Sequence, residues 1–256
     1  MTEDKRSLEL EIVVPGTPDE VWRAIATGPG ISSWYVPHVV EERAGGAAMA
    51  SFGPGMDAPG RVAAWEPPHR IVFDGGEGDD GMTFEWLVEE RRVGSCVVRL
   101  INSGFESGQA GDDHFEQMRK GWQLFLRNLQ LHCTHFAGQT ATAMLPMAMW
   151  SGPQEAVWGS LLRALGFPAA PAVGERVATR GDGTPTLIGT VVESDALRLI
   201  ILVEEPAPGT AFVAAEGQGD EWTVSVWSYL YGDAGKAAAN HDDPHWRQWL
   251  SDHTAT

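Results

Sequence analysis

Few side chains within the apolar patterns of this sequence could carry acid–base chemistry. Tyr35, His38, Asn102 and His114 each donate or accept hydrogen bonds, and the tyrosine and histidines can also transfer protons. An enzyme that orients a reactive chain would need these groups to converge inside a pocket. A structural role would leave them exposed or bonded to the backbone. Both readings stay open, and the sequence identifies no catalytic residue.

Established catalytic motifs are absent from the sequence. It contains no GxSxG nucleophile turn, no phosphate-binding P-loop and no dinucleotide-binding glycine pattern. Their absence counts against a hydrolase or a nucleotide-dependent enzyme. We therefore expect no cofactor.

The segment from His241 to His245 contains side chains that could bind a metal. Its spacing matches no strong zinc template, and Asp243 followed by Pro244 is typical of the start of a helix. We interpret the segment as a helix start over 244–253 and expect no metal site.

Composition limits the partners of the chain. Its 256 residues carry a formal net charge of −17, which repels phosphate backbones and anionic lipids, so we expect neither nucleic acid nor membrane as a partner. No apolar run approaches the roughly 18 residues that a membrane span requires. The start of the chain is polar, and Cys96 and Cys133 form no CxxC motif. These features favour a cytoplasmic protein with free thiols.

The first half of the chain has the order strand, helix, strands, long helix. Residues 8–14 alternate as a strand, and Thr17 to Glu20 form a capping box before a helix. Residues 36–105 are broken by turn residues into an antiparallel meander. Residues 112–136 then carry apolar side chains three and four apart, which predicts one long amphipathic helix that begins near Asp112.

A similar order repeats after Gly138. Residues 143–150 read as a strand, the segment at Val157-Trp158 echoes Val21-Trp22, and two later strand pairs precede a short final helix. The copy lacks much of the early strand region. The sequence thus predicts an α+β protein with two tandem domains, residues 7–137 and a degenerate copy at 141–256.

The first half resembles a known superfamily. The resemblance rests on the capped helix with Val21-Trp22, the turn at Trp34, Gly60-Arg61-Val62, the strand end at 102–105 and the helix with Gly121-Trp122. Together they resemble the SRPBCC or START-like superfamily, in the branch named after the activator of heat-shock protein 90 ATPase. The resemblance covers residues 7–137 well and the second half weakly.

The resemblance implies a helix-grip fold, in which a curved antiparallel sheet surrounds a long C-terminal helix with an apolar pocket between them. The strand pair of the family often ends in a histidine, where this chain has Asn102. An inward Asn102 would bond either to protein or to a ligand, and the aromatic side chains would form either plain core or pocket wall. The expected pocket residues are Trp34, Tyr35, Phe52, Trp65, Phe84, Trp86, Leu100, Asn102, Phe115, Met118, Trp122 and Phe125.

Three functions are compatible with this fold. The leading hypothesis is a non-enzymatic protein that binds a small hydrophobic or aromatic molecule in the first domain. The second is an interaction module of the co-chaperone type, whose partner would be a chaperone or another protein. The third is an enzyme of the polyketide cyclase or aromatase type. Each follows from the resemblance, because the fold supports several functions.

Overall fold

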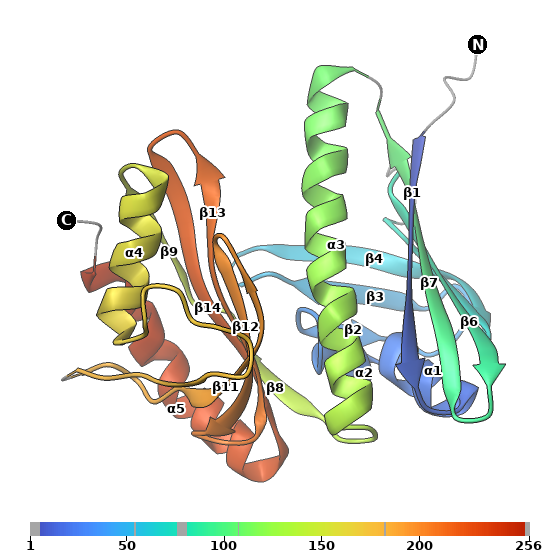
Figure 1. Cartoon of the computed structure of the whole chain (residues 1–256). Helices are drawn as coiled ribbons and strands as arrows, with labels where there is room; N and C mark the ends of the chain where they lie inside the picture. Colours follow the sequence, from blue (N-terminus) through green and yellow to red (C-terminus); the bar gives the residue numbers. More distant parts are fainter. Residues whose placement is uncertain (1–5, 54, 76–80, 107, 182, 254–256) are drawn as a thin grey trace. The chain divides into compact units, whose positions relative to one another are not determined.

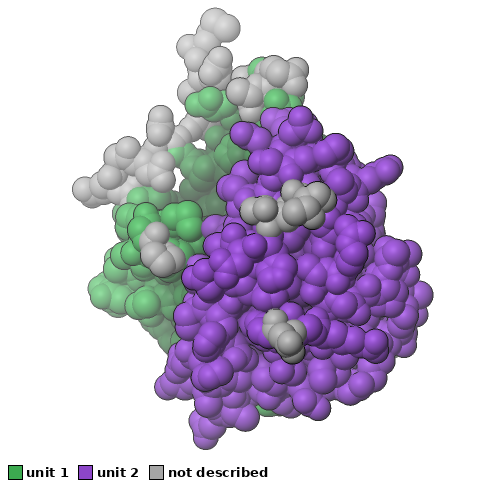
Figure 2. All heavy atoms as spheres, turned by 90° about the vertical axis from the view of Figure 1, so that its left-hand side faces the viewer, with its two compact units in different colours: residues 1–140 green, residues 141–256 purple. Residues whose placement is uncertain are grey.

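The structure is a computed structural model that describes residues 6–53, 55–75, 81–106, 108–181 and 183–253. The chain divides into two compact units, residues 1–140 and residues 141–256 (Figure 2). Among the helices in these described ranges, none is long and apolar enough to cross a membrane.

The first unit is an antiparallel sheet of seven strands packed against a long helix (Figure 1). Its order across the sheet is β1-β7-β6-β5-β4-β3-β2. The strands are β1 (Arg6–Pro15), β2 (His38–Val40), β3 (Ala47–Ser51), β4 (Asp57–Glu66), β5 (Arg70–Asp74), β6 (Thr83–Arg92) and β7 (Ser95–Phe105). The helices are α1 (Pro18–Ala26), α2 (Gly28–Ser32) and α3 (Gln109–His135).

The second unit repeats this architecture, so the expected tandem α+β helix-grip fold is confirmed. Its sheet order is β10-β11-β12-β13-β14-β8, and β9 also pairs with β14. The strands are β8 (Ala141–Met144), β9 (Met147–Ser151), β10 (Arg176–Ala178), β11 (Ile188–Asp195), β12 (Arg198–Glu205), β13 (Gly209–Gln218) and β14 (Glu221–Tyr231). The helices are α4 (Gln154–Leu165) and α5 (Gly232–Asp252).

The second unit lacks part of the early strand region, as the sequence predicted. Its sheet is counted as seven strands because its first strand is divided, and it has only β10 where the first unit has β2 and β3. The strand expected at 143–150 is divided into β8 and β9, which pair with successive parts of β14 and flank Leu145 and Pro146.

The last helix corrects a second expectation. α5 contains 21 residues and includes Pro244 in its interior, whereas the sequence predicted a helix that starts at Pro244. A proline cannot donate the hydrogen bond to the carbonyl four residues earlier, and this costs helix stability. The apolar side chains of Ala239 and Trp246, on either side of Pro244, are both buried in the core of the second unit. Burial of both segments offsets the cost of the missing bond.

The starts of α1 and α3 differ in how well they follow the local sequence signals. In α1, the backbone N–H of Thr17 donates to Glu20 Oε2 at 2.8 Å, and the backbone N–H of Glu20 donates to Thr17 Oγ1, so the predicted capping box is confirmed. α3 begins three residues before the predicted Asp112, after Gly108 with φ of 99°. Asp112 instead accepts a hydrogen bond from Arg6.

The turn after α2 is bound to two helices through Trp34. The indole N–H of Trp34 donates to the carbonyl of Ala24 in α1 at 2.8 Å, and the side-chain amide of Asn128 in α3 donates to the carbonyl of Trp34 at 2.8 Å. Trp34 and Asn128 are almost fully buried. The next residue, Tyr35, is therefore held at a fixed place between α2 and α3.

Both cysteines are buried free thiols, as expected. Burial raises the pKa of Cys133 to about 12, so this thiol is protonated at neutral pH.

Replacing Asn128 with alanine tests the bond between α3 and the turn. The buried carbonyl of Trp34 would lose its donor, and we expect the first unit to lose about 1–3 kcal/mol in free energy of unfolding. Urea unfolding measures the loss. Gln123→Ala, which removes an exposed amide from the same helix, should change stability by less than about 0.5 kcal/mol. Equal effects of the two substitutions would contradict the assigned role.

Histidine burial in α3 predicts a pH dependence of stability. Burial lowers the pKa of His132 to about 4 from its ordinary value of 6.5, so the unfolded chain binds this proton more readily than the folded one. Stability from this group is complete above pH 6.5 and falls as the pH drops towards 4, by on the order of 3 kcal/mol. Urea unfolding of His132→Gln should show a weaker slope over this range. His135→Gln, at an exposed site of the same helix, should keep the wild-type slope.

Candidate functional site

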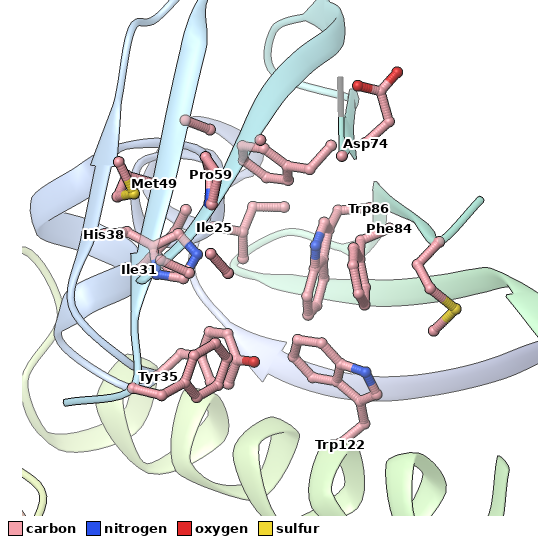
Figure 3. Close-up of a pocket in the computed structure, with 18 of the residues that line it drawn as sticks. Ile25, Ile31, Tyr35, His38, Met49, Pro59, Asp74, Phe84, Trp86 and Trp122 are labelled. Atoms are coloured by element: carbon pink, nitrogen blue, oxygen red, sulfur yellow. The ribbon is translucent and has the colours of Figure 1, made fainter. Parts of the chain in front are cut away.

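A cavity of about 320 Å³ lies within the first unit (Figure 3). One wall comes from α1, α2 and the turn that follows, a second from strands β2 to β6, and the last from α3. The lining residues are Ile25, Ile31, Trp34, Tyr35, His38, Ala48, Met49, Ala50, Phe52, Ala58, Pro59, Gly60, Phe73, Asp74, Gly75, Met82, Phe84, Trp86, Met118 and Trp122.

Trp122 of α3 is the centre of an aromatic cluster that forms one side of the cavity. Its ring centroid lies 4.9 Å from that of Tyr35, 5.5 Å from Trp86 and 5.7 Å from Phe84. Trp34 packs edge-on against Trp86 at 5.6 Å. Trp34 and Trp122 meet Trp86 edge-to-face, whereas the ring of Trp122 is tilted against those of Tyr35 and Phe84. These contacts hold each ring in a defined orientation, so this side of the cavity is rigid without a ligand.

Short side chains on β3 and β4 explain why the space is not filled. Ala48 is paired with Gly60, and Ala50 with Ala58, across the two strands. A side chain at Gly60 would collide with the backbone carbonyl of Asp74, because an added Cβ would lie 2.8 Å from that oxygen. Small residues here face large aromatic residues on β6 and α3, and the mismatch in size leaves the cavity.

His38 presents one ring nitrogen to this space. Its Nδ1 lies 2.7 Å from the carbonyl oxygen of Val36. Burial lowers the pKa of His38 below its ordinary value, which favours the neutral ring at neutral pH. Figure 3 shows a ring nitrogen on the side that faces Ile25.

Tyr35 and Trp86 add two hydrogen-bond donors. The hydroxyl of Tyr35 and the indole N–H of Trp86 form no hydrogen bond with the residues that the structure describes, and Figure 3 shows both directed towards the interior of the site. Burial raises the pKa of Tyr35 well above 10, so its hydroxyl keeps its proton.

Asp74 is the acidic side chain of the lining, and it is paired. Arg61 donates to its two carboxylate oxygens from Nε at 3.2 Å and from the terminal nitrogen at 2.8 Å. The two-point contact neutralises the carboxylate.

The structure brings together seven of the twelve expected pocket residues. These are Trp34, Tyr35, Phe52, Phe84, Trp86, Met118 and Trp122. Five are outside the lining, namely Trp65, Leu100, Asn102, Phe115 and Phe125.

The five residues outside the lining are used in packing. Trp65 packs against Trp22 of α1 at 5.0 Å, and Phe115 against Phe105 at 5.0 Å. Leu100 is fully buried opposite Trp86 in the sheet. Phe125 lies 4.4 Å from the ring of Tyr35 and supports it. A residue on the cavity-facing side of its strand or helix therefore does not always line the cavity, because some of these residues pack against neighbouring elements instead.

Asn102 is buried, and its amide donates to the backbone carbonyl of Thr83 at 3.1 Å. Its Oδ1 has no hydrogen-bond partner among the described residues. Of the four polar residues singled out in the sequence, Tyr35 and His38 meet in the cavity, with ring centroids 5.4 Å apart. His114 is exposed and lies beside Phe105 instead.

Sequence reasoning missed the small side of the cavity. Small residues are common, so their type alone does not indicate a cavity. Only the pairing of β3 with β4 brings together Ala48, Ala50, Ala58 and Gly60. The available signal was the high content of small side chains at residues 47–51.

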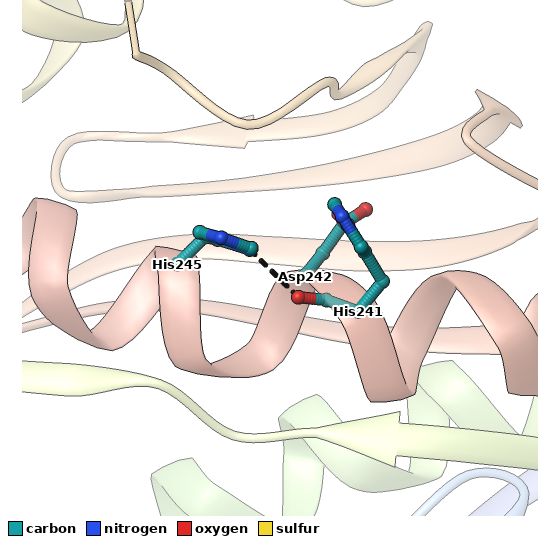
Figure 4. A group of neighbouring side chains, drawn as sticks. All are labelled: His241, Asp242 and His245. Carbon is teal, nitrogen blue, oxygen red and sulfur yellow. Dashed lines mark hydrogen bonds and ion pairs between the residues drawn. The ribbon is translucent and has the colours of Figure 1, made fainter.

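One group of side chains in the described residues is close enough to share a metal ion. Ligand atoms of His241, Asp242 and His245 on α5 lie within 4.8 Å of one another (Figure 4). Two ring nitrogens already have local partners: His241 Nδ1 lies 2.6 Å from Asp242 Oδ1, and His245 Nδ1 lies 2.7 Å from the carbonyl of His241. Both histidines are exposed. These contacts account for the group without an ion.

Comparison with solved structures gives matches to one unit and to both. The Aha1 dimer of Colwellia psychrerythraea is 15% identical, with a TM-score of 0.44, over 50% of this chain and 96% of that one. The di-domain ARO/CYC BexL of the BE-7585A biosynthetic pathway is 18% identical, with a TM-score of 0.44, over 98% of this chain and 99% of that one. DynU16, from the dynemicin biosynthetic locus, is 16% identical over 96% of each chain, also with a TM-score of 0.44. These values carry no argument about ligand or activity.

No curated protein matches the chain. A family model does match it, over residues 15–133, from the end of β1 almost to the end of α3. That segment contains every residue that lines the cavity. Over this segment the first unit is similar to the Activator of Hsp90 ATPase homolog 1-like family, a branch of the SRPBCC superfamily.

Proposed function

We propose that the first unit binds a small, uncharged, largely aromatic molecule in the cavity between its sheet and α3. The observation that carries the proposal is a preformed cavity of about 320 Å³ with an aromatic wall and hydrogen-bonding groups that have no partner among the described residues. Ligand sites are typically concave and mostly apolar, with a few polar groups that fix orientation. This cavity has each of these properties.

The size of the cavity favours a compact ligand. Its volume lies near the lower end of the range of about 300–1,000 Å³ that small-molecule sites occupy. One or two fused rings fit such a space better than a long acyl chain. Trp122, Trp86 and Tyr35 offer ring faces and edges for stacking against such a ligand.

The balanced charge of the lining favours an uncharged ligand. Asp74 is neutralised by Arg61, and the described residues of the lining include no lysine or arginine. A charged ligand would lose its hydration on entering and gain no opposite charge in return, which is costly in an apolar site.

Apolar side chains at the rim provide a route for entry. Met49 and Phe52 both line the cavity and are 40% and 37% exposed. The space is therefore reached from the surface between β3 and the turn after it, without opening the core.

Filling the cavity should abolish binding. Ala50→Leu adds a branched side chain to the lining, and we expect affinity for 2-naphthol, measured by equilibrium dialysis, to fall at least about tenfold because ligand and side chain compete for one space. Ala47→Leu makes the same change at an exposed position of the same strand, outside the lining, and should leave affinity unchanged.

If neither 2-naphthol nor 2-methylnaphthalene binds the wild-type protein, and native mass spectrometry of the purified protein shows no retained small molecule, the proposal is wrong. Equal loss of binding in the two alanine variants would also count against this cavity as the site.

A second candidate is contact with a chaperone of the Hsp90 type, which the description of the matched family suggests. Exposed apolar side chains near the cavity would provide the surface: Val39 is 70% exposed, Met56 44% and Met49 40%. Exposed apolar groups of this kind can mark protein contacts.

The ATPase rate of such a chaperone from the same organism tests this second function. Added wild-type protein should raise the rate, and Val39→Ser should raise it less while leaving 2-naphthol binding unchanged, because Val39 lies outside the cavity lining. An ATPase rate that is the same with and without the protein would contradict it.

A further inference from the structure

The hydrogen bond to Val36 fixes the tautomer of His38. A backbone carbonyl oxygen only accepts hydrogen bonds, so the Nδ1 that lies 2.7 Å from it must carry the proton. In a neutral imidazole the other nitrogen, Nε2, then has a lone pair and no proton. The site therefore contains a hydrogen-bond acceptor whose character is set by the backbone.

The environment of His38 keeps the ring neutral. Burial lowers its pKa, and no ion pair to it is formed by the residues that the structure describes. The ring lies 5.4 Å from that of Tyr35, which is itself uncharged. At neutral pH, Nε2 is thus an acceptor and not a donor.

Two other accessible polar groups of the lining can donate hydrogen bonds. Trp86 offers only an N–H, and the Tyr35 hydroxyl can donate as well as accept. Asp74 is occupied by Arg61 at the edge of the site. At Nε2 of His38, by contrast, a ligand has to donate the hydrogen bond.

We propose that His38 selects, for this binding site, neutral aromatic ligands that carry a hydroxyl group, with the phenolic O–H donating to His38 Nε2. The inference rests on the proposed function and specifies the ligand class of that same cavity. Tyr35 and Trp86 are then available for an oxygen elsewhere on the ligand.

Two other ligand classes fit this arrangement less well. A pure hydrocarbon would cover Nε2 and leave a buried acceptor without a partner. An aromatic carboxylate has no proton to donate at neutral pH, and its charge would meet the His38 lone pair with no free cation in the lining. A phenol supplies the proton and remains uncharged, because its ordinary pKa is near 10.

A matched pair of probes tests the selection. 2-Naphthol and 2-methylnaphthalene have the same ring system and differ by a hydroxyl in place of a methyl group of similar size. We expect the wild-type protein to bind 2-naphthol about tenfold more tightly in equilibrium dialysis at pH 7, since an unsatisfied buried acceptor weakens binding by about this factor or more.

Variants of His38 assign the preference to its ring. His38→Leu should reduce the ratio of the two affinities to about one, with 2-methylnaphthalene still bound, which shows that the cavity is intact. His38→Gln places an amide oxygen within reach of the Nε2 position and should restore part of the preference.

The outcomes separate this inference from the proposed function. If both probes bind the wild-type protein equally, or if the preference survives in His38→Leu, the role of His38 is wrong while the binding function stands. If neither probe binds the wild-type protein, the selection by His38 is wrong, and the binding function falls with it when native mass spectrometry also shows no retained small molecule.

Discussion

The buried hydrogen bond from Asn128 to the carbonyl of Trp34 is the contact on which the site depends. With the bond from the Trp34 indole to Ala24, it connects α1, the turn after α2 and the middle of α3. Both bonds are buried, where a lost partner is costly because water cannot replace it. The chain between α2 and β2 is therefore held in one position, with Tyr35 on that short stretch and His38 directly after it at the start of β2.

The cavity results from an imbalance in side-chain size across a rigid frame. α3 and β6 contribute Trp122 and Trp86, whereas β3 and β4 contribute alanine and glycine. Protein interiors normally pack to high density, so an unfilled space with rigid walls is a departure from ordinary core packing. The packing of Trp122 against Tyr35 and Trp86 prevents the aromatic rings from collapsing into the gap. A frame of this kind is suited to hold a flat molecule without reorganising.

The polar groups of the cavity differ in whether other protein groups already satisfy their hydrogen bonds. Asp74 is paired with Arg61. Tyr35, Trp86 and His38 Nε2 keep hydrogen-bonding capacity directed at the space. Buried polar groups in proteins are normally satisfied. Residual capacity inside a cavity is what a ligand with complementary groups would complete, and the backbone contact of His38 makes its side of that match specific.

The sequence by itself determined the order of the elements, the capping box at Thr17, the apolar stripe of α3 and the presence of two copies. These are local or periodic signals, and each is written in residues close together in the chain. It did not determine the length of α5, because Pro244 is a local signal for a helix start while the burial of Ala239 and Trp246 is a tertiary effect. Nor did it distinguish Trp86, which lines the cavity, from Trp65, which packs on Trp22. Both are tryptophans on strands of the same sheet. Only the tertiary structure decided between them, because the space beside a side chain is set by residues distant in sequence, here the alanines of β3 and β4 and the turn held by Asn128.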